Sequence, residues 1–77
     1  MNLIEQLKAM NMADARRQAQ EILQRQAEVL WEQVCSWEGK KTSDPFVIIS
    51  PDNPHRRRFD DVIRKGVELG LEIRVRP

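Results

Sequence analysis

MADARRQAQEILQRQAEVLWEQVCSW, the sequence of residues 12–37, decides the fold of this 77-residue chain. The stretch contains neither Gly nor Pro and is rich in Ala, Gln, Glu, Arg and Leu, which are good helix formers. At about 100° per residue, its apolar side chains gather on one broad face. The pattern therefore predicts one long amphipathic helix with these apolar positions: Ala15, Ala19, Ile22, Leu23, Val29, Leu30, Val34 and Trp37.

The length of this helix predicts self-association. Residues 12–37 at about 1.5 Å each form a helix of about 39 Å, whereas a compact chain of this size is roughly 30 Å across. The helix should overhang its own domain and expose apolar surface, which a second copy would cover. A four- and three-residue spacing, typical of a short coiled-coil seam, marks the expected homodimer interface: Leu23, Ala27, Leu30, Val34 and Trp37.

Two glutamines lie within the same apolar face of the long helix. Gln26 and Gln33 either mark the edge of the apolar stripe or set the register inside a dimer. Upstream, residues 2–10 predict a short helix whose apolar face is rotated from that of the long one. This short helix either folds back after a break at Asn11 or extends the long helix.

The second half of the chain predicts two strands around a helix. Residues 46–49, FVII, form a continuous β-branched apolar run, which predicts a strand buried on both faces. A helix is expected over residues 54–69, because Asn53 suits the N-cap and Pro54 the first helical position. Residues 71–76 alternate between apolar and charged side chains, as a half-buried strand does.

The three glycines predict two helix ends and one close contact. Gly39 and Gly70 are expected to end the two long helices in the left-handed conformation. Gly66 lies in the apolar face of the second helix, which indicates close approach of a sheet or another helix.

Strand, helix and strand with short connections form a right-handed βαβ unit with parallel strands. The sequence thus predicts a single α/β (α+β) domain over residues 1–77: a helical arm at 1–38, a linker at 39–45 and the βαβ unit at 46–77. A two-stranded sheet is marginal alone. Both helices would cover it, or it would pair edge to edge across a dimer.

Composition bounds the chemistry. The net charge is +1, but residues 39–77 carry nine Lys/Arg against six Asp/Glu, so the basic excess lies in the second half. Cys35 is the one cysteine, which excludes an internal disulfide and predicts a reducing cytoplasm. Neither a signal peptide nor a membrane span is predicted. His55 lacks ligand companions, so no metal or cofactor is expected.

The most distinctive motif is HRRR at residues 55–58, in the first turn of the predicted second helix. Three cations are unfavourable at the positive end of a helix, and a bound anion would compensate them. Nearby aspartates could instead neutralise the arginines, or the arginines are simply solvated. The preceding turn lacks the glycines of a phosphate-binding loop. Arg74 and Arg76 would extend this basic surface.

Trp31 is the exception in the long helix, because it lies opposite the apolar stripe. The C-terminal part covers both Trp31 and Cys35, or Trp31 is exposed as an anchor for another protein. Candidate partner- or anion-binding residues are therefore Trp31, His55, Arg56, Arg57, Arg58, Arg74 and Arg76.

Catalysis is not predicted, because no acid–base pair or nucleophile–base pair is evident in the sequence. The sequence favours a small non-enzymatic interaction protein, an accessory regulator or inhibitor that binds a larger protein as a homodimer. The alternative is a nucleic-acid-binding protein that uses the arginine-rich start of the second helix. A third hypothesis is an enzyme or a phosphoryl-ligand binder that uses the loop at residues 50–58.

Overall fold

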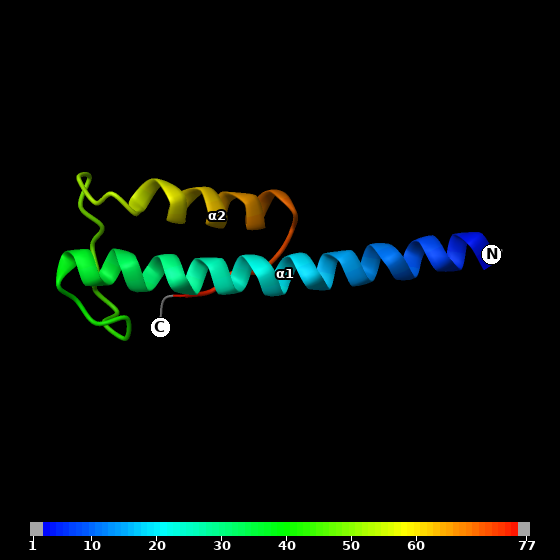
Figure 1. The fold of residues 1–77 in the computed structure, drawn as a ribbon, viewed down its shortest axis with the longest axis horizontal. Helices are drawn as coiled ribbons and strands as arrows, with labels where there is room; N and C mark the ends of the chain where they lie inside the picture. The colour runs from blue at the N-terminus through cyan, green and yellow to red at the C-terminus, as the bar shows by residue number, and fades with distance from the viewer. Residues whose placement is uncertain (1–2, 76–77) are drawn as a thin grey trace.

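One helix determines the shape of the molecule. The computed structural model describes residues 3–75, apart from the side chains of residues 4–11. Helix α1, Leu3–Glu38, runs from the blue N-terminal end to the green region in Figure 1. Its 36 residues, at about 1.5 Å each, account for nearly all of the 55 Å length of the molecule, which is 20 Å by 15 Å across. Helix α1 therefore extends well beyond the rest of the chain, as its length predicted.

Helix α1 is continuous through Asn11. Of the two predictions for the N-terminal residues, extension of the long helix is the correct one. A change in the direction of the apolar face does not break a helix, because each backbone N–H still reaches the carbonyl four residues earlier. Without Gly or Pro, nothing in the sequence opposes that ladder.

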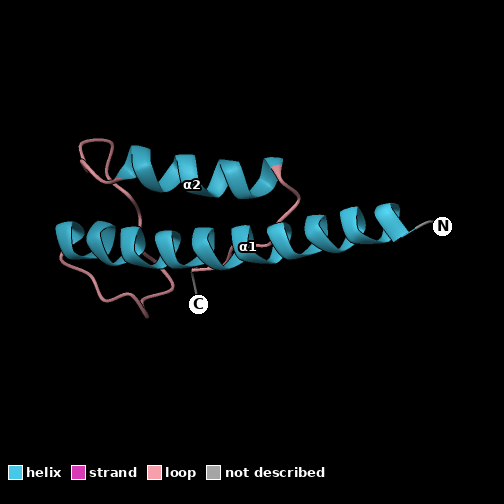
Figure 2. Cartoon of the chain, turned by 45° about the vertical axis from the view of Figure 1, so that its right-hand side comes forward, coloured by secondary structure: helices cyan, strands magenta, loops and turns pink. Residues whose placement is uncertain are grey.

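Helix α2, Arg56–Glu68, lies beside the C-terminal half of α1 (Figures 1 and 2). It begins two residues later and ends one residue earlier than the predicted helix. A tight turn leads into it, in which Asn53 Oδ1 accepts the His55 N–H at 3.0 Å. The carbonyl of Asn53 accepts the Arg56 N–H at 3.2 Å. The predicted N-cap is therefore wrong: Asn53 stabilises the turn before α2, whereas His55 is the N-cap of α2 and makes no side-chain capping hydrogen bond.

Both helices end in the same glycine motif. Gly39 and Gly70 have φ of 72° and 69°, in the left-handed region that disfavours other residues. The Lys40 N–H bonds to the Cys35 carbonyl at 2.9 Å, and the Leu71 N–H bonds to the Gly66 carbonyl at 2.8 Å. These are the six-to-one bonds of a Schellman motif, so both predicted helix ends are confirmed.

The chain is all-α, and the predicted α/β fold is wrong. Residues 3–75 contain two helices and no strand, and Figure 2 shows helices joined only by loops. The predicted βαβ unit and its two-stranded parallel sheet are therefore absent from this part of the chain. Phe46 belongs to a turn, and residues 47–49 and 71–75 have no regular secondary structure.

The C-terminal segment, residues 71–75, shows why its sequence indicated a strand. Leu71, Ile73 and Val75 are half-buried, whereas Glu72 and Arg74 are exposed. The predicted alternation of burial is therefore correct, although the predicted strand is not. An alternating pattern shows which side chains of a segment face the core. It does not show whether the neighbouring element is a sheet or, as here, a helix.

Two glutamine side chains of α1 take the place of a neighbouring strand. Gln20 donates to the Glu72 carbonyl at 2.5 Å and accepts the Glu72 N–H at 3.3 Å. Gln24 donates to the Arg74 carbonyl at 2.6 Å and accepts the Arg74 N–H at 3.1 Å. Four residues of a helix rise about 6 Å, and two residues of an extended chain span about 6.6 Å. The two glutamines therefore match alternate residues of the segment.

The core lies between α1, α2 and the segment before α2. It consists of Trp31, Val34, Cys35, Val47 and Phe59. The rings of Trp31 and Phe59 are 5.3 Å apart and tilted by 37°, a favourable arrangement for an aromatic pair. Within the described part of the chain, neither helix combines the length and apolar character needed to span a membrane.

Candidate protein-binding surface

Residues 46–49 lie against the core with alternate side chains facing in and out. Val47 is buried and Ile49 packs against the same cluster, whereas Phe46 and Ile48 are 84% and 85% exposed. The prediction of a strand buried on both faces is therefore wrong. The core covers one face of this segment, and no described residue covers Phe46 or Ile48 on the other. We call Phe46 and Ile48 the outward pair.

Hydrogen bonds fix the segment at both ends. At its start, Asp44 Oδ1 accepts the Phe46 N–H at 2.8 Å. At its end, Glu38 Oε2 accepts the Ser50 N–H at 3.0 Å, and Glu38 Oε1 accepts the Ser50 hydroxyl at 2.5 Å. Because the backbone is held on either side and Val47 is buried between, the outward pair projects in a defined direction.

Asn53 completes this attachment to the end of α1. Its side chain is buried, and its Nδ2 donates to the Val34 carbonyl at 3.2 Å. Its N–H donates to the Ser50 carbonyl at 3.0 Å, which closes a tight turn with Pro51 at the second position, where proline is favoured. We call Glu38, Ser50 and Asn53 the latch.

The latch changes the acidity of Glu38. The hydrogen bond from the Ser50 hydroxyl, followed by the one from the Ser50 N–H, lowers the pKa of Glu38. Partial desolvation opposes this shift, and the Asn53 side chain adds to it. Both oxygens of the carboxylate accept hydrogen bonds, which favour its charged form.

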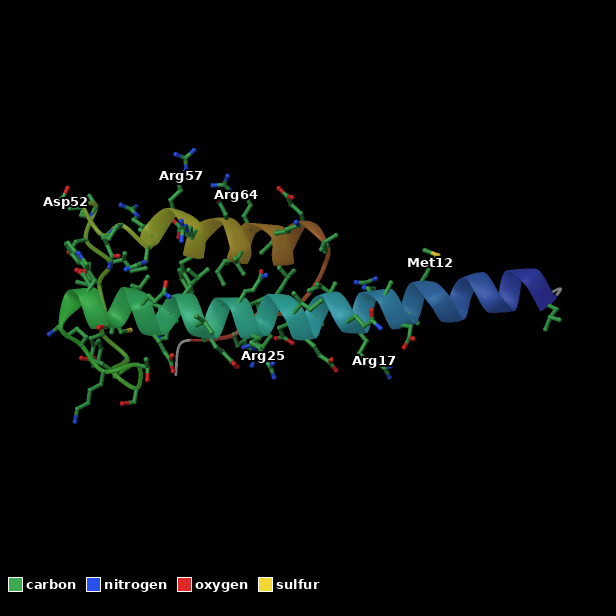
Figure 3. All side chains as sticks on the ribbon, viewed as in Figure 1. Met12, Arg17, Arg25, Asp52, Arg57 and Arg64 are labelled. Carbon is green, nitrogen blue, oxygen red and sulfur yellow. The ribbon has the colours of Figure 1, made fainter. Side chains whose placement is uncertain are left out.

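The arginine turn, residues 55–58, lies on the exposed side of α2. His55 is half-buried, while Arg56, Arg57 and Arg58 are exposed. Arg56 Nε lies 3.7 Å from Asp60 Oδ2, so one aspartate partly neutralises the turn, as one of the predicted alternatives held. Figure 3 shows Arg57 and Arg64 pointing away from α1.

A shallow hollow lies along this side of α2. Its lining mixes both signs of charge, because Asp60 and Asp61 alternate with the arginines along the helix. The surface is therefore polar and mixed rather than a continuous cationic patch. The hollow is lined by Pro51, Asn53, Arg56, Arg57, Asp60, Asp61 and Arg64.

Arg74, another candidate arginine, does not join this turn. Arg74 pairs with Glu72 in its own segment, and Arg76 lies outside the described residues. In Figures 1 and 2 the described chain beyond α2 passes along α1 and reaches the side away from α2.

Trp31 and most of the predicted dimer seam are covered by the chain itself. Trp31 is 2% exposed, and its Nε1 donates to the Thr42 carbonyl at 3.3 Å. Of the two alternatives for Trp31 and Cys35, coverage by the C-terminal part is therefore the one observed, and Trp31 is not accessible as an anchor. Along the seam, Leu23, Ala27 and Val34 are buried, Leu30 is half-buried, and Trp37 remains about half exposed.

Sequence reasoning missed the outward pair and the latch. A continuous apolar run does not say which of its faces is covered. The available signal was chain length, because a chain of 77 residues with one long helix has little left to cover a second face. The latch joins residues distant in sequence, Glu38 and Ser50, by ordinary polar side chains that form no motif.

No family model, curated protein or solved structure is significantly similar to this chain. Within the described residues, no group of three His, Cys, Asp or Glu side chains is placed to hold a metal ion. What these residues do present is the outward pair on a fixed backbone and the mixed-charge side of α2.

Proposed function

We propose that this chain is a small non-enzymatic interaction protein that binds a larger protein, with the outward pair as the anchor of the complex. The observation that supports this is the exposure of Phe46 and Ile48, at 84% and 85%, on a segment fixed at both ends. An aromatic and an aliphatic side chain in a defined direction suit an apolar pocket. Their prior ordering lowers the entropy cost of binding.

The proposal extends to the biological setting. An accessory regulator or inhibitor can act simply by binding a site on its partner. The outward pair on residues 46–49 offers a surface for such binding. A single buried thiol, Cys35, is compatible with a reducing cytoplasm. We therefore extend the proposal to an interaction in the cytoplasm.

The experiment is photo-crosslinking from the proposed anchor. A benzophenone amino acid replaces Phe46, and the same amino acid replaces Val67, another exposed apolar residue, on α2. We expect one specific protein adduct from position 46 and its loss in the additional variant Ile48→Asp. Circular dichroism checks that each variant stays helical. Equal adducts from both positions, or an adduct that is insensitive to Ile48→Asp, would contradict the proposal.

The arginine turn supports a second candidate, nucleic-acid binding. Among the described residues, Arg57, Arg58 and Arg64 are exposed and have no carboxylate within the 4.0 Å limit of an ion pair. Fluorescence anisotropy with labelled DNA and RNA at about 50 and 200 mM salt tests it. This function requires an affinity that falls steeply with salt and is lost in Arg56→Ala/Arg57→Ala/Arg58→Ala. Flat traces at both salts would remove it.

A further inference from the structure

We propose that a second copy of this chain packs, parallel and in register, on a face of α1 that the fold leaves open. This second face is distinct from the predicted seam, of which the chain itself buries Leu23, Ala27 and Val34. It goes beyond the proposed function, because it lies away from the outward pair. The second face consists of Ala15, Ala19, Ile22, Gln26, Val29 and Gln33, of which Ala19 is half-buried and the other five are exposed.

The spacing of these residues is that of a helix–helix contact. Successive positions are four, three, four, three and four apart, so they form one straight stripe. The stripe lies roughly 120° around α1 from the buried residues Ala27 and Val34. Ile22 and Val29 are 56% and 48% exposed, and none of the six positions carries a charge.

The chain exposes more surface than a compact protein of its mass, and part of this surface could be buried in a dimer. A compact protein of 9.1 kDa has an accessible surface of about 4,900 Å², whereas this chain exposes 6233 Å². The excess, about 1,300 Å², exceeds the roughly 800 Å² that each partner buries in a standard interface. A second copy on α1 removes surface that the chain itself cannot cover.

Gln26 and Gln33 favour a parallel over an antiparallel pair of α1 helices. In a parallel pair in register, Gln26 and Gln33 each meet their own counterpart, and an amide both donates and accepts. In an antiparallel pair about the same centre, Gln26 meets Val29 and Gln33 meets Ile22, which leaves the amides unpaired at a cost. Paired polar residues inside an apolar seam also fix its register. Both considerations favour the parallel arrangement.

The first test is the mass of the purified full chain. Light scattering at about 100 µM should give about twice 9.1 kDa, and Ile22→Glu/Val29→Glu should give the monomer mass. The helical circular dichroism of this variant should be retained, because neither residue is in the core. Val67→Glu, at an exposed apolar residue of α2, is the matched control and should keep the dimer mass. A monomeric unmodified chain, or a variant that stays dimeric, overturns the proposal.

The second test reports the register. Gln26→Cys should form a disulfide-linked dimer under mild oxidation, because counterparts in a parallel pair lie close enough for one. Glu21→Cys, on an exposed position outside the second face, should not. Absence of a link at position 26 overturns the parallel register. Phe46→Ala/Ile48→Ala should keep the dimer mass, so failure here is distinguishable from failure of the proposed function.

Discussion

Asn53 is the buried polar residue that ties the loop to α1. Its Nδ2 donates to the Val34 carbonyl and its Oδ1 accepts the His55 N–H, so Asn53→Ala removes both bonds and leaves a partly buried donor without a partner. We expect the free energy of unfolding to fall by about 1–3 kcal/mol, measured by urea denaturation. Asp52→Ala, in the same turn but exposed, should change it by less than about 0.5 kcal/mol. Equal effects of the two substitutions would argue against the latch.

Glu38 makes the latch sensitive to acid. Its pKa is lowered in the folded chain by the hydrogen bonds from Ser50. The stability that these bonds contribute is therefore fully present above the unfolded pKa of about 4.3, and it is lost as the pH falls through the lower folded value. Melting temperatures between about pH 3 and 6 should decline more steeply for the unmodified chain than for Glu38→Gln. Glu32→Gln, exposed and outside the latch, should keep the unmodified slope.

At the scale of elements, the C-terminal segment depends on two side chains of α1. Gln20→Ala/Gln24→Ala removes the four hydrogen bonds to Glu72 and Arg74. Hydrogen exchange of those two amides should accelerate toward the unprotected rate, while amides of the α1 core keep their protection. Gln24→Glu is the sharper variant, because a carboxylate accepts the Arg74 N–H but cannot donate to its carbonyl. Unchanged protection at Arg74 in the alanine variant would contradict this attachment.

Gly66 sets how closely the same segment approaches α2. A Cβ at this position would lie 2.6 Å from Ile73 Cγ1, so Gly66→Ala forces the segment away. Overpacking costs about 1–3 kcal/mol against a gain of about 1 kcal/mol in helix propensity, and we expect a net loss of stability. Adding Ile73→Ala removes the clashing atom. The double variant should therefore be more stable than the sum of the two single effects, as a double-mutant cycle measures; additive effects would contradict the clash.

The elements show what the sequence could and could not predict. Both helices and their glycine ends follow from local rules that hold wherever the chain folds. The close approach at Gly66 was also predicted, but the neighbour is Ile73 of the C-terminal segment and not a sheet or another helix. The prediction of two strands was wrong because β propensity and alternation indicate which side chains are buried. They do not indicate what the backbone of the segment hydrogen-bonds to. The backbone of residues 71–75 hydrogen-bonds to the side chains of Gln20 and Gln24. In the sequence these two glutamines are recognisable only as good helix formers. The outward pair was missed for the related reason that a run of apolar residues does not identify its exposed face.

At the scale of the whole molecule, the chain covers one face of α1 and leaves another largely exposed. One face, with Ala27 and Val34 buried, holds the short elements of the chain. The sequence predicted a seam there because those residues have coiled-coil spacing, but the chain uses them for its own core. Overhang was predictable from length alone. Length alone could not predict which face of α1 stays exposed, because that depends on where residues 39–75 pack.

A chain this small also gains stability if it associates, which yields a last prediction. If folding is coupled to pairing on the second face, the melting temperature rises with concentration. For two chains of 77 residues the rise is roughly 4 °C for each tenfold increase. Scanning calorimetry from about 10 to 1,000 µM measures it, and Ile22→Glu/Val29→Glu should abolish the dependence. Phe46→Ala/Ile48→Ala should preserve it, because the outward pair lies off that face. A concentration-independent melting temperature in the unmodified chain would mean that the second face does not stabilise the fold by pairing.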